Sequence, residues 1–297
     1  MSSLLITGGT GTVGKAVARE ALDRGYTRVC IYSRDEHKQA LMRDELGDDE
    51  RLRWFLGDVR DRERLRRALQ GVGSVIHAAA LKRVEAGEYN PGEFVKTNVL
   101  GTLNLIEAAQ DADVQKVVGI STDKAFNPQN AYGATKLLME KLLLAANNAR
   151  GDYGPRFAVT RFGNVMGSRG SVLENWLALK AAGAKSLPVT DPRCTRYWLR
   201  QEEAVGNVMQ TLAVMPPEPI ALTLSGFLIT DLALALQMPW HEVGLRAGES
   251  LHESMGYGDS SDTAQRMRLG EIMERLNIPV VAEAEARLTE QLKRWAG

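Results

Sequence analysis

Cysteine is scarce in this sequence, and neither sign of charge is in excess. The 297 residues include only two cysteines, Cys30 and Cys194, and Cys30 falls in a predicted core strand. We therefore expect no disulfide framework, and a reducing compartment suits the chain. The 37 basic and 37 acidic side chains cancel, so the overall charge gives no sign of a nucleic-acid partner.

Long hydrophobic runs are also missing. No stretch approaches the ~20 apolar residues that cross a membrane. Residues 1–6 lack the charged and long apolar regions of a signal peptide. Internal repeats and low-complexity segments are missing too. These absences predict a soluble cytoplasmic protein with no membrane partner.

Short apolar runs alternate with amphipathic helical patterns over the first 165 residues. This alternation is typical of a parallel α/β sheet. Pro91 suits the first turn of a helix that continues to residue 109. Predicted strands cover residues 4–7, 29–32, 52–56, 74–78, 116–121 and 158–161, and helical patterns begin near residues 13, 36, 62, 93 and 132. We expect a Rossmann-type, doubly wound parallel sheet in residues 1–165.

The pattern breaks into shorter pieces after Gly163. The sequence predicts a helix over residues 172–182, a strand over 187–190, a helix over 202–214, an apolar run over 220–224 after a proline-rich turn, and two helices within 263–295. We expect residues 166–297 to form a smaller, mostly helical substrate-binding region. Some of these later segments should add a strand and a helix to the first domain.

A glycine-rich loop follows the first predicted strand and opens a helix, which is the context of a dinucleotide fingerprint. Its glycines would permit a tight turn and let pyrophosphate approach the backbone N–H groups at the helix N-terminus. Alone, such a loop could be an ordinary strand-to-helix turn. The cofactor contacts that we predict here are Thr7, Gly8, Gly11, Thr12, Val13 and Gly14.

The end of the second predicted strand bears on the choice between NAD and NADP. An acidic residue there would accept the ribose hydroxyls of NAD, whereas an arginine accommodates the 2′-phosphate of NADP. Arg34 follows Ser33 directly after the strand, with Lys38 close by, so the sequence favours NADP over NAD. Asp58 and Val59 end the third strand, where Asp58 could bind the adenine amino group or cap the next helix.

Tyr132 and Lys136 stand one helical turn apart, which places a phenol and an ammonium on the same helix face. A nearby cation favours phenolate, so Tyr132 can take a proton from a sugar hydroxyl as hydride leaves the same carbon. Asp123 and Lys124, just upstream, add a second acid and a second base. An oxidation needs one proton acceptor, so this extra pair indicates a further step on the substrate.

Several motifs together resemble the extended short-chain dehydrogenase/reductase superfamily: the glycines at 8, 11 and 14, Asp58, the segment 77–80, and Tyr132 with Lys136. Further segments are similar to one branch, the soluble inverting UDP-N-acetylglucosamine 4,6-dehydratases that begin pseudaminic acid biosynthesis: 32–36, 57–61, 77–82, 88–91, 96–98, 121–124, 161–165, 167–171 and 195–198. The similarity extends to about residue 255. Membrane-anchored retaining relatives usually carry Met where this chain has Tyr132.

The resemblance implies a nucleotide-sugar 4,6-dehydratase reaction. Tyr132, activated by Lys136, would take the proton of the 4-hydroxyl while C4 loses hydride to NADP. The ketone acidifies C5, so that neutral Lys124 can act as base and Asp123 can protonate the departing 6-hydroxyl. Hydride then returns to C6, and reprotonation on the opposite face inverts C5. Thr122 would hydrogen-bond the 4-hydroxyl region.

The resemblance also assigns binding residues and an assembly. Further cofactor contacts are Ala78, Ala79, Ala80, Lys82 and Asn98, together with Tyr132 and Lys136. Predicted UDP-sugar contacts are Lys82, Asn164, Arg169, Arg196, Arg246 and Glu249. No metal is expected. Helices over residues 93–109 and 137–147 carry broad apolar faces that predict a homo-oligomer, unless these faces are buried within one chain.

Some positions depart from the family pattern, and they leave alternatives open. Ser250 stands where the family usually has Lys, and Glu85 where proline is common. The chain could therefore act on a different nucleotide sugar. A nucleotide-sugar 4-epimerase would need Tyr132 and Lys136 but no Asp-Lys pair. A non-catalytic NADP-binding sensor or scaffold is the remaining alternative, although such proteins typically lack the Tyr or the Lys.

Overall fold

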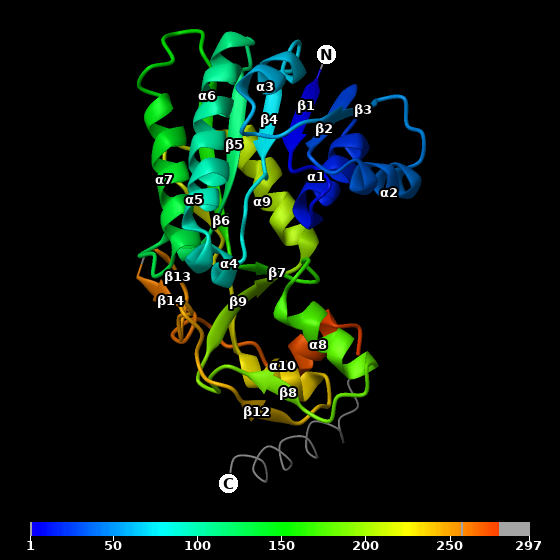
Figure 1. The fold of residues 1–297 in the computed structure, drawn as a ribbon, viewed down its shortest axis with the longest axis vertical. Helices are drawn as coiled ribbons and strands as arrows, with labels where there is room; N and C mark the ends of the chain where they lie inside the picture. Colours follow the sequence, from blue (N-terminus) through cyan, green and yellow to red (C-terminus); the bar gives the residue numbers. More distant parts are fainter. Residues whose placement is uncertain (1, 257, 279–297) are drawn as a thin grey trace. The chain divides into compact units, whose positions relative to one another are not determined.

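A computed structural model describes residues 2–256 and 258–278 (Figure 1). The chain divides into two compact units. Unit 1 consists of Met1–Phe162 and Gln201–Leu222, and unit 2 of Gly163–Arg200 and Thr223–Gly297. The sequence placed a domain boundary at residue 165 and expected later segments to contribute to the first domain. Within the described residues, no helix is both long and apolar enough to cross a membrane.

Unit 1 contains a seven-stranded sheet in the order β10-β6-β5-β4-β1-β2-β3, with every neighbouring pair parallel. Its strands are β1 (Ser3–Thr7), β2 (Arg28–Ser33), β3 (Leu52–Leu56), β4 (Ser74–His77), β5 (Lys116–Thr122), β6 (Arg156–Phe162) and β10 (Ile220–Ala221). The strand order reverses between β1 and β4, which is the topological switch point of a doubly wound sheet. The predicted Rossmann-type fold is confirmed.

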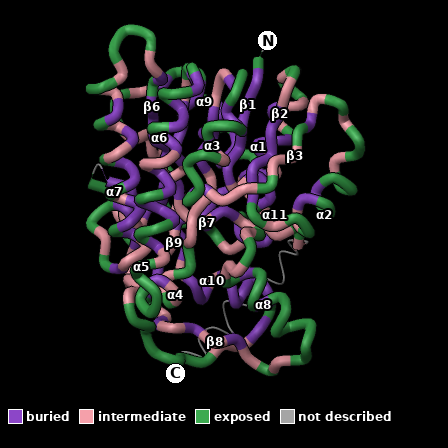
Figure 2. Tube along the Cα trace, turned by 45° about the horizontal axis from the view of Figure 1, so that its top comes forward, coloured by how far each residue is buried: buried purple, intermediate pink, exposed green. Residues whose placement is uncertain are grey.

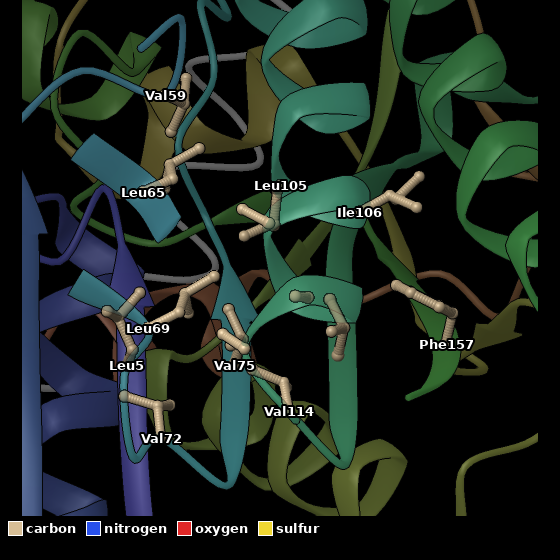
Figure 3. Packing of buried hydrophobic residues seen from close by; sticks show 14 of the residues in the cluster. Leu5, Val59, Leu65, Leu69, Val72, Val75, Leu105, Ile106, Val114 and Phe157 are labelled. Carbon is tan, nitrogen blue, oxygen red and sulfur yellow. The ribbon is translucent and has the colours of Figure 1, made fainter. Parts of the chain in front are cut away.

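Helices surround this sheet because both of its faces are apolar. They are α1 (Thr12–Asp23), α2 (Glu36–Leu46), α3 (Arg62–Ala68), α4 (Val84–Tyr89), α5 (Pro91–Phe94), α6 (Gly101–Asp111), α7 (Ala131–Ala146) and α9 (Gln201–Val214). Leu5 of β1 packs in one core cluster with Leu65 of α3, Leu105 of α6 and Leu143 of α7 (Figure 3). Strand neighbours point to opposite faces, so Leu4 and Ile6, both fully buried, face the other layer. Figure 2 shows the central strands β1 and β2 mostly in the colour of buried residues.

The segment after Pro91 differs from the single helix that we predicted. Pro91 does occupy the first turn of α5, but residues Val95–Leu100 form a π-helix, η1, before α6 begins at Gly101. This π-helix has six residues, which are too few for an apolar period to distinguish it from the flanking α-helices. The π-turn lies where Asn98 projects into the interior, and Asn98 is 1% exposed.

Unit 2 mixes short strands with helices. Its elements are β7 (Asn164–Val165), α8 (Val172–Ala181), β8 (Leu187–Val189), β9 (Thr195–Leu199), β11 (Gly226–Leu228), α10 (Ile229–Ala235), β12 (Trp240–Glu242), β13 (Ser254–Gly256), β14 (Asp259–Ser260) and α11 (Leu269–Arg275). The predicted helix at 172–182 and strand at 187–190 are confirmed. The three-stranded sheet β11-β9-β7 was not expected. Of the two helices predicted within 263–295, the described residues contain α11, and the part after residue 278 lies outside them.

Candidate active site

The loop between β1 and α1 has the backbone that the dinucleotide fingerprint requires. Gly8 has a φ of +66°, and a Cβ there would lie 2.8 Å from the backbone of Ala79. A Cβ on Gly14 would lie 2.6 Å from the carbonyl oxygen of Gly8. Gly11 caps α1 without a side-chain hydrogen bond, and the first turn carries no acidic residue. Such a loop can present backbone N–H groups to an anion, and it packs against the segment that follows β4. The cofactor contacts of its residues stay a prediction.

Charged side chains follow β2 and β3. Asp35 caps α2 by accepting from the Lys38 N–H at 3.0 Å, and its carboxylate pairs with the Lys38 ammonium at 2.6 Å. Arg34 is half-exposed, and its Nη1 lies 3.5 Å from Oδ2 of Asp58. Asp35, the acidic residue nearest the predicted ribose position, is thus engaged in the cap of α2 and in the ion pair with Lys38. Arg34, in contrast, makes a long contact to Asp58.

Asp58 does not cap the following helix. The N-cap of α3 is Asp61, and Asp58 instead accepts from Arg60 at 3.1 Å (Nε) and 2.8 Å (Nη2). Burial raises the pKa of Asp58, but the hydrogen bonds from Arg60 and the charges of Arg34 and Arg60 together leave this pKa below its ordinary value. Arg60 was missed in the sequence, although its spacing two residues after Asp58 was a signal.

Asp123 lies at the C-terminal end of β5, in a short 3₁₀ turn, η2 (Asp123–Ala125). Its Oδ1 accepts from the Thr122 hydroxyl at 2.8 Å, from the Lys124 N–H at 2.8 Å and from the Lys124 ammonium at 3.1 Å. Its Oδ2 is buried and has no hydrogen-bond partner, although the residue is only 1% exposed. A buried oxygen without a partner is costly, so this atom is a candidate to carry a proton or to meet a ligand.

Gly133 brings the helix with Tyr132 against this turn. Asn130 caps α7 by accepting from the Gly133 N–H at 2.7 Å. A Cβ at Gly133 would lie 2.1 Å from the carbonyl oxygen of Lys124, so only glycine allows the first turn of α7 to approach η2 so closely. Tyr132 packs edge-on against Phe94, with ring centroids 6.4 Å apart. The two predicted catalytic segments therefore meet within unit 1.

Lys136, one turn after Tyr132 on α7, is buried. Its ammonium donates to the carbonyl of Ile120 at 2.6 Å and lies 2.8 Å from the sulfur of Met139. Burial lowers the pKa of Lys136 from 10.5 to about 7, and the nearby Glu140 carboxylate opposes this shift. A lysine with such a pKa can change its protonation state at neutral pH, which suits a proton-transfer site.

A buried ion pair next to Lys136 was missed in the sequence. Glu140 accepts from Arg161 Nε at 2.7 Å and from Arg161 Nη2 at 2.5 Å, and the two side chains are 2% and 12% exposed. Ser121, which precedes Thr122, donates to the same carboxylate. The pair thus joins β5, β6 and α7 behind the catalytic segments. Glu140 follows Lys136 by four residues, and this spacing could have predicted that both share one helix face.

The side chain of Asn98 is occupied by protein groups. Its Oδ1 accepts from the Leu81 N–H at 2.9 Å, and its Nδ2 donates to the Leu81 carbonyl at 3.0 Å and to the Thr135 hydroxyl at 3.1 Å. Asn98 therefore holds the chain beside Lys82, which follows Leu81. Its predicted contact with a cofactor stays a prediction.

Unit 2 brings together some of the predicted substrate residues. Arg196, 13% exposed on its side chain, contacts Glu249 at 3.1 Å and donates to the carbonyls of Thr195 and Leu251. Glu249 also accepts from the backbone N–H of Arg246 at 3.4 Å. Asn164, another predicted substrate residue, donates to the Tyr197 carbonyl at 3.2 Å. The side chains of Arg169 and Arg246 are exposed. Among the described residues, no cluster of His, Cys, Asp and Glu could hold a metal ion.

A sequence profile of the polysaccharide biosynthesis protein family matches residues 4–275, which is most of the chain. The chain belongs to this family. Two family relatives from strains of Campylobacter jejuni, both named UDP-N-acetylglucosamine 4,6-dehydratase (inverting), are 46% and 47% identical over 263 residues. The matched region is 87% of this chain and 78% of each relative. The resemblance predicted from the motifs, and the prediction of a dehydratase-type enzyme, are confirmed.

Other relatives extend the range of activities. A protein of Rickettsia rickettsii named UDP-glucose 4-epimerase is 39% identical over 277 residues, 90% of this chain and 81% of its own. The crystal structure of Pen from Bacillus thuringiensis superposes with a TM-score of 0.87 at 30% identity, over 93% of this chain and 98% of that one. A dTDP-glucose 4,6-dehydratase from Streptomyces venezuelae, solved with NAD, reaches 0.76 at 24% identity over 98% of this chain and 97% of its own, which shows the fold alone.

Proposed function

We propose that this chain is an NADP-dependent lyase that converts UDP-N-acetylglucosamine into a 4-keto-6-deoxy sugar with inversion at C5. The observation that carries the proposal is the packing of Asp123 and Lys124 against the helix turn that bears Tyr132, with buried Lys136 one turn farther along. A simple alcohol oxidation would need only the Tyr and Lys. The inverting dehydratases that are 46% and 47% identical support the choice of substrate.

A nicotinamide dinucleotide is supported in unit 1 because Gly8 and Gly14 allow close backbone contacts in the loop that a Cβ would prevent, and because the start of α1 has no side-chain cap. When bound, it would accept hydride from C4 and return it to C6. The residues that would hold it are the predicted loop residues from Thr7 to Gly14, Ala78 to Ala80, and Arg34. Arg34 supports NADP, since Asp35 is engaged in the cap of α2 and in its ion pair with Lys38. Competition of NADP with NAD for the purified enzyme tests this choice.

The residues divide the proton transfers among them. Tyr132 takes the proton of the 4-hydroxyl as C4 becomes a ketone. Lys124 removes the proton from C5, which the ketone has made acidic, and Asp123 protonates the 6-hydroxyl so that it leaves as water. Reprotonation of C5 on the opposite face gives the inverted sugar. The products are one 4-keto-6-deoxy nucleotide sugar and one water, and the cofactor ends unchanged.

The two oxygens of Asp123 support its role as the acid. Oδ1 accepts three hydrogen bonds, so a proton on this carboxyl belongs on Oδ2, which is buried and has no hydrogen-bond partner among the described residues. A protonated Oδ2 would donate to the departing hydroxyl. Thr122 orients the carboxyl through its hydrogen bond to Oδ1.

We assign the UDP part of the substrate to residues of unit 2 on the family resemblance. Arg196 and Arg169 would neutralise the diphosphate, Arg246 would reach the nucleotide phosphate or ribose, and Asn164 would bind a diphosphate oxygen or the sugar. Glu249, and Lys82 of unit 1, are further proposed substrate contacts. We also infer a cytoplasmic homo-oligomer. Val95, Leu100 and Leu138 on the predicted helices are 42%, 47% and 47% exposed. Light scattering of the purified protein measures its oligomeric state.

The test of the function is incubation with UDP-N-acetylglucosamine in deuterated water, followed by NMR and mass spectrometry. We expect loss of one water and deuterium at an inverted C5. Dehydration with the configuration at C5 retained would agree with Asp123 as the acid but would contradict the proposed inversion at C5. Epimerisation at C4 without loss of water would favour the second candidate, a 4-epimerase, which the Rickettsia relative supports. Bound NADP without turnover of any nucleotide sugar would favour the sensor or scaffold.

A further inference from the structure

His77 ends β4 and is completely enclosed, with 1% of its surface exposed. The strand register places it beside Thr7, the last residue of β1. Its Nδ1 lies 2.7 Å from the Thr7 hydroxyl, and its Nε2 lies 3.1 Å from the Thr102 hydroxyl of α6. The proposed reaction gives His77 no chemical step, so its two buried hydrogen bonds need another explanation.

The neighbours of His77 determine which ring nitrogen carries the proton. The Thr102 hydroxyl donates its single hydrogen to the Asn98 carbonyl at 2.7 Å, so it can only accept from His77. The imidazole is therefore an Nε2–H tautomer, and its Nδ1 accepts the hydrogen of the Thr7 hydroxyl. Thr7 in turn accepts from the Ala79 N–H at 3.3 Å. Burial, and then the Lys136 charge, lower the pKa of His77 to about 3, which keeps the ring neutral.

The same line of hydrogen bonds continues to the catalytic helix. Asn98 donates from Nδ2 to the Thr135 hydroxyl, and Thr135 donates to the carbonyl of Tyr132 at 2.8 Å. In each hydrogen bond along this path, the neighbouring groups fix which atom donates and which accepts. The path begins at Thr7, where the dinucleotide loop starts, and ends at the backbone of Tyr132.

We propose that His77 is a positioning residue whose Nε2–H tautomer ties the dinucleotide loop to the π-helix around Asn98 and, through it, to the helix of Tyr132. Loss of the His77 hydrogen bonds should weaken cofactor binding and lower kcat together, because the dinucleotide loop and the helix of Tyr132 would both shift. The inference uses the cofactor site of the proposed function. It does not depend on which nucleotide sugar is the substrate.

The tautomer can be measured directly in the whole protein. The chain has four histidines, so ring ¹⁵N labelling gives few signals, and the variant His77→Gln identifies the one of interest. We expect the His77 ring to stay neutral, with the proton on Nε2, from mildly acidic to alkaline pH. An Nδ1–H tautomer, or titration in the ordinary range of histidine, would overturn the proposal without reference to any turnover.

A matched pair of threonines separates positioning from general stability. Thr102 and Thr211 are both fully buried, and each donates to the carbonyl four residues earlier, Thr211 to Asn207 at 2.8 Å. Thr102→Val removes the hydroxyl that accepts from His77 Nε2–H. Thr211→Val removes a matching hydroxyl-to-carbonyl bond on α9 that is not part of this path. We expect Thr102→Val to weaken NADP binding about tenfold, with a similar loss of kcat, and Thr211→Val to change either by less than about twofold.

Two further readouts complete this test. Thr102→Ser restores the hydroxyl and should recover NADP binding and the His77 ¹⁵N signature. The free energy of unfolding should fall further for Thr102→Val, which loses its bonds to both Asn98 and His77, than for Thr211→Val, which loses its bond to Asn207. Equal NADP affinities for Thr102→Val and Thr211→Val would overturn the positioning role. If Thr102→Val does not fold, an Nδ1–H tautomer in the unmodified protein still overturns the proposal, and the NADP affinity of His77→Gln tests the positioning role.

Discussion

The candidate residues of the two units are held in different ways. In unit 1, Asp123, Lys136 and Glu140 are buried, and each has short hydrogen bonds to backbone or to a charged partner. In unit 2, Arg196 and Glu249 form a partly exposed pair, and Arg246 is exposed. Burial makes a charge sensitive to its surroundings, whereas water screens an exposed one. The surroundings in unit 1 thus suit the proton transfers that we propose, and those in unit 2 suit the proposed binding of a charged, hydrated ligand.

The largest effect should follow from Asp123→Asn, which keeps the size of the side chain but removes the acid. We expect kcat for dehydration to fall by about 10²–10⁴-fold with little change in KM, since general acid catalysis contributes about that much. The measurement is steady-state formation of the keto sugar. Asp61→Asn, at the exposed cap of α3, is the control and should keep kcat. A normal kcat in Asp123→Asn would show that Asp123 is not the general acid.

The next prediction compares one ion pair from each unit by chemical denaturation. Glu140→Gln leaves Arg161 buried without its partner, and we expect the free energy of unfolding to fall by about 3–5 kcal/mol. Glu249→Gln weakens the pair with Arg196, which is more exposed, and should cost about 1 kcal/mol. Equal losses would mean that the two pairs are held alike, contrary to the contrast between the units.

A third prediction concerns the pH dependence of stability. The pKa of Lys136 is about 7 in the folded protein and 10.5 when unperturbed. Between these values the unfolded chain binds more protons, so the free energy of unfolding should rise as pH increases from about 7 to 10.5, by a few kcal/mol. The contribution is lost as pH falls through 7. Lys136→Met should remove this rise, whereas Lys141→Met, an exposed lysine on the same helix, should retain it. A rise that survives Lys136→Met would refute the assignment to this lysine.

The difference between the units also explains what the sequence could predict. The core strands of unit 1 are short runs of apolar residues between helices, and β1, β2 and β3 match their predicted ranges within one residue at each end. Tyr132 and Lys136 could be found because they share one helix. Glu140 is on helix α7 and its partner Arg161 lies 21 residues later on strand β6, so only the three-dimensional structure identifies the pair.

In unit 2 the local signals are weaker. Strands β7 and β11 have two and three residues, too short for an alternating pattern to be recognised. Their pairing with β9 depends on contacts between segments far apart in the sequence. The glycine at 133 shows a similar limit in unit 1, because its close contact with the Lys124 carbonyl cannot be derived from spacing alone.

The smallest effect should come from Arg246→Ala in unit 2. An exposed arginine that meets the diphosphate contributes equally to the substrate and the transition state, so its loss should raise KM about tenfold and leave kcat unchanged. The increase in KM should shrink as salt is added, because salt screens the remaining attraction in both proteins. Arg275→Ala, on α11, serves as a control for loss of one positive charge. A fall in kcat with constant KM would instead place Arg246 among the residues that act on the reacting atoms, and the contrast between the two units would no longer hold.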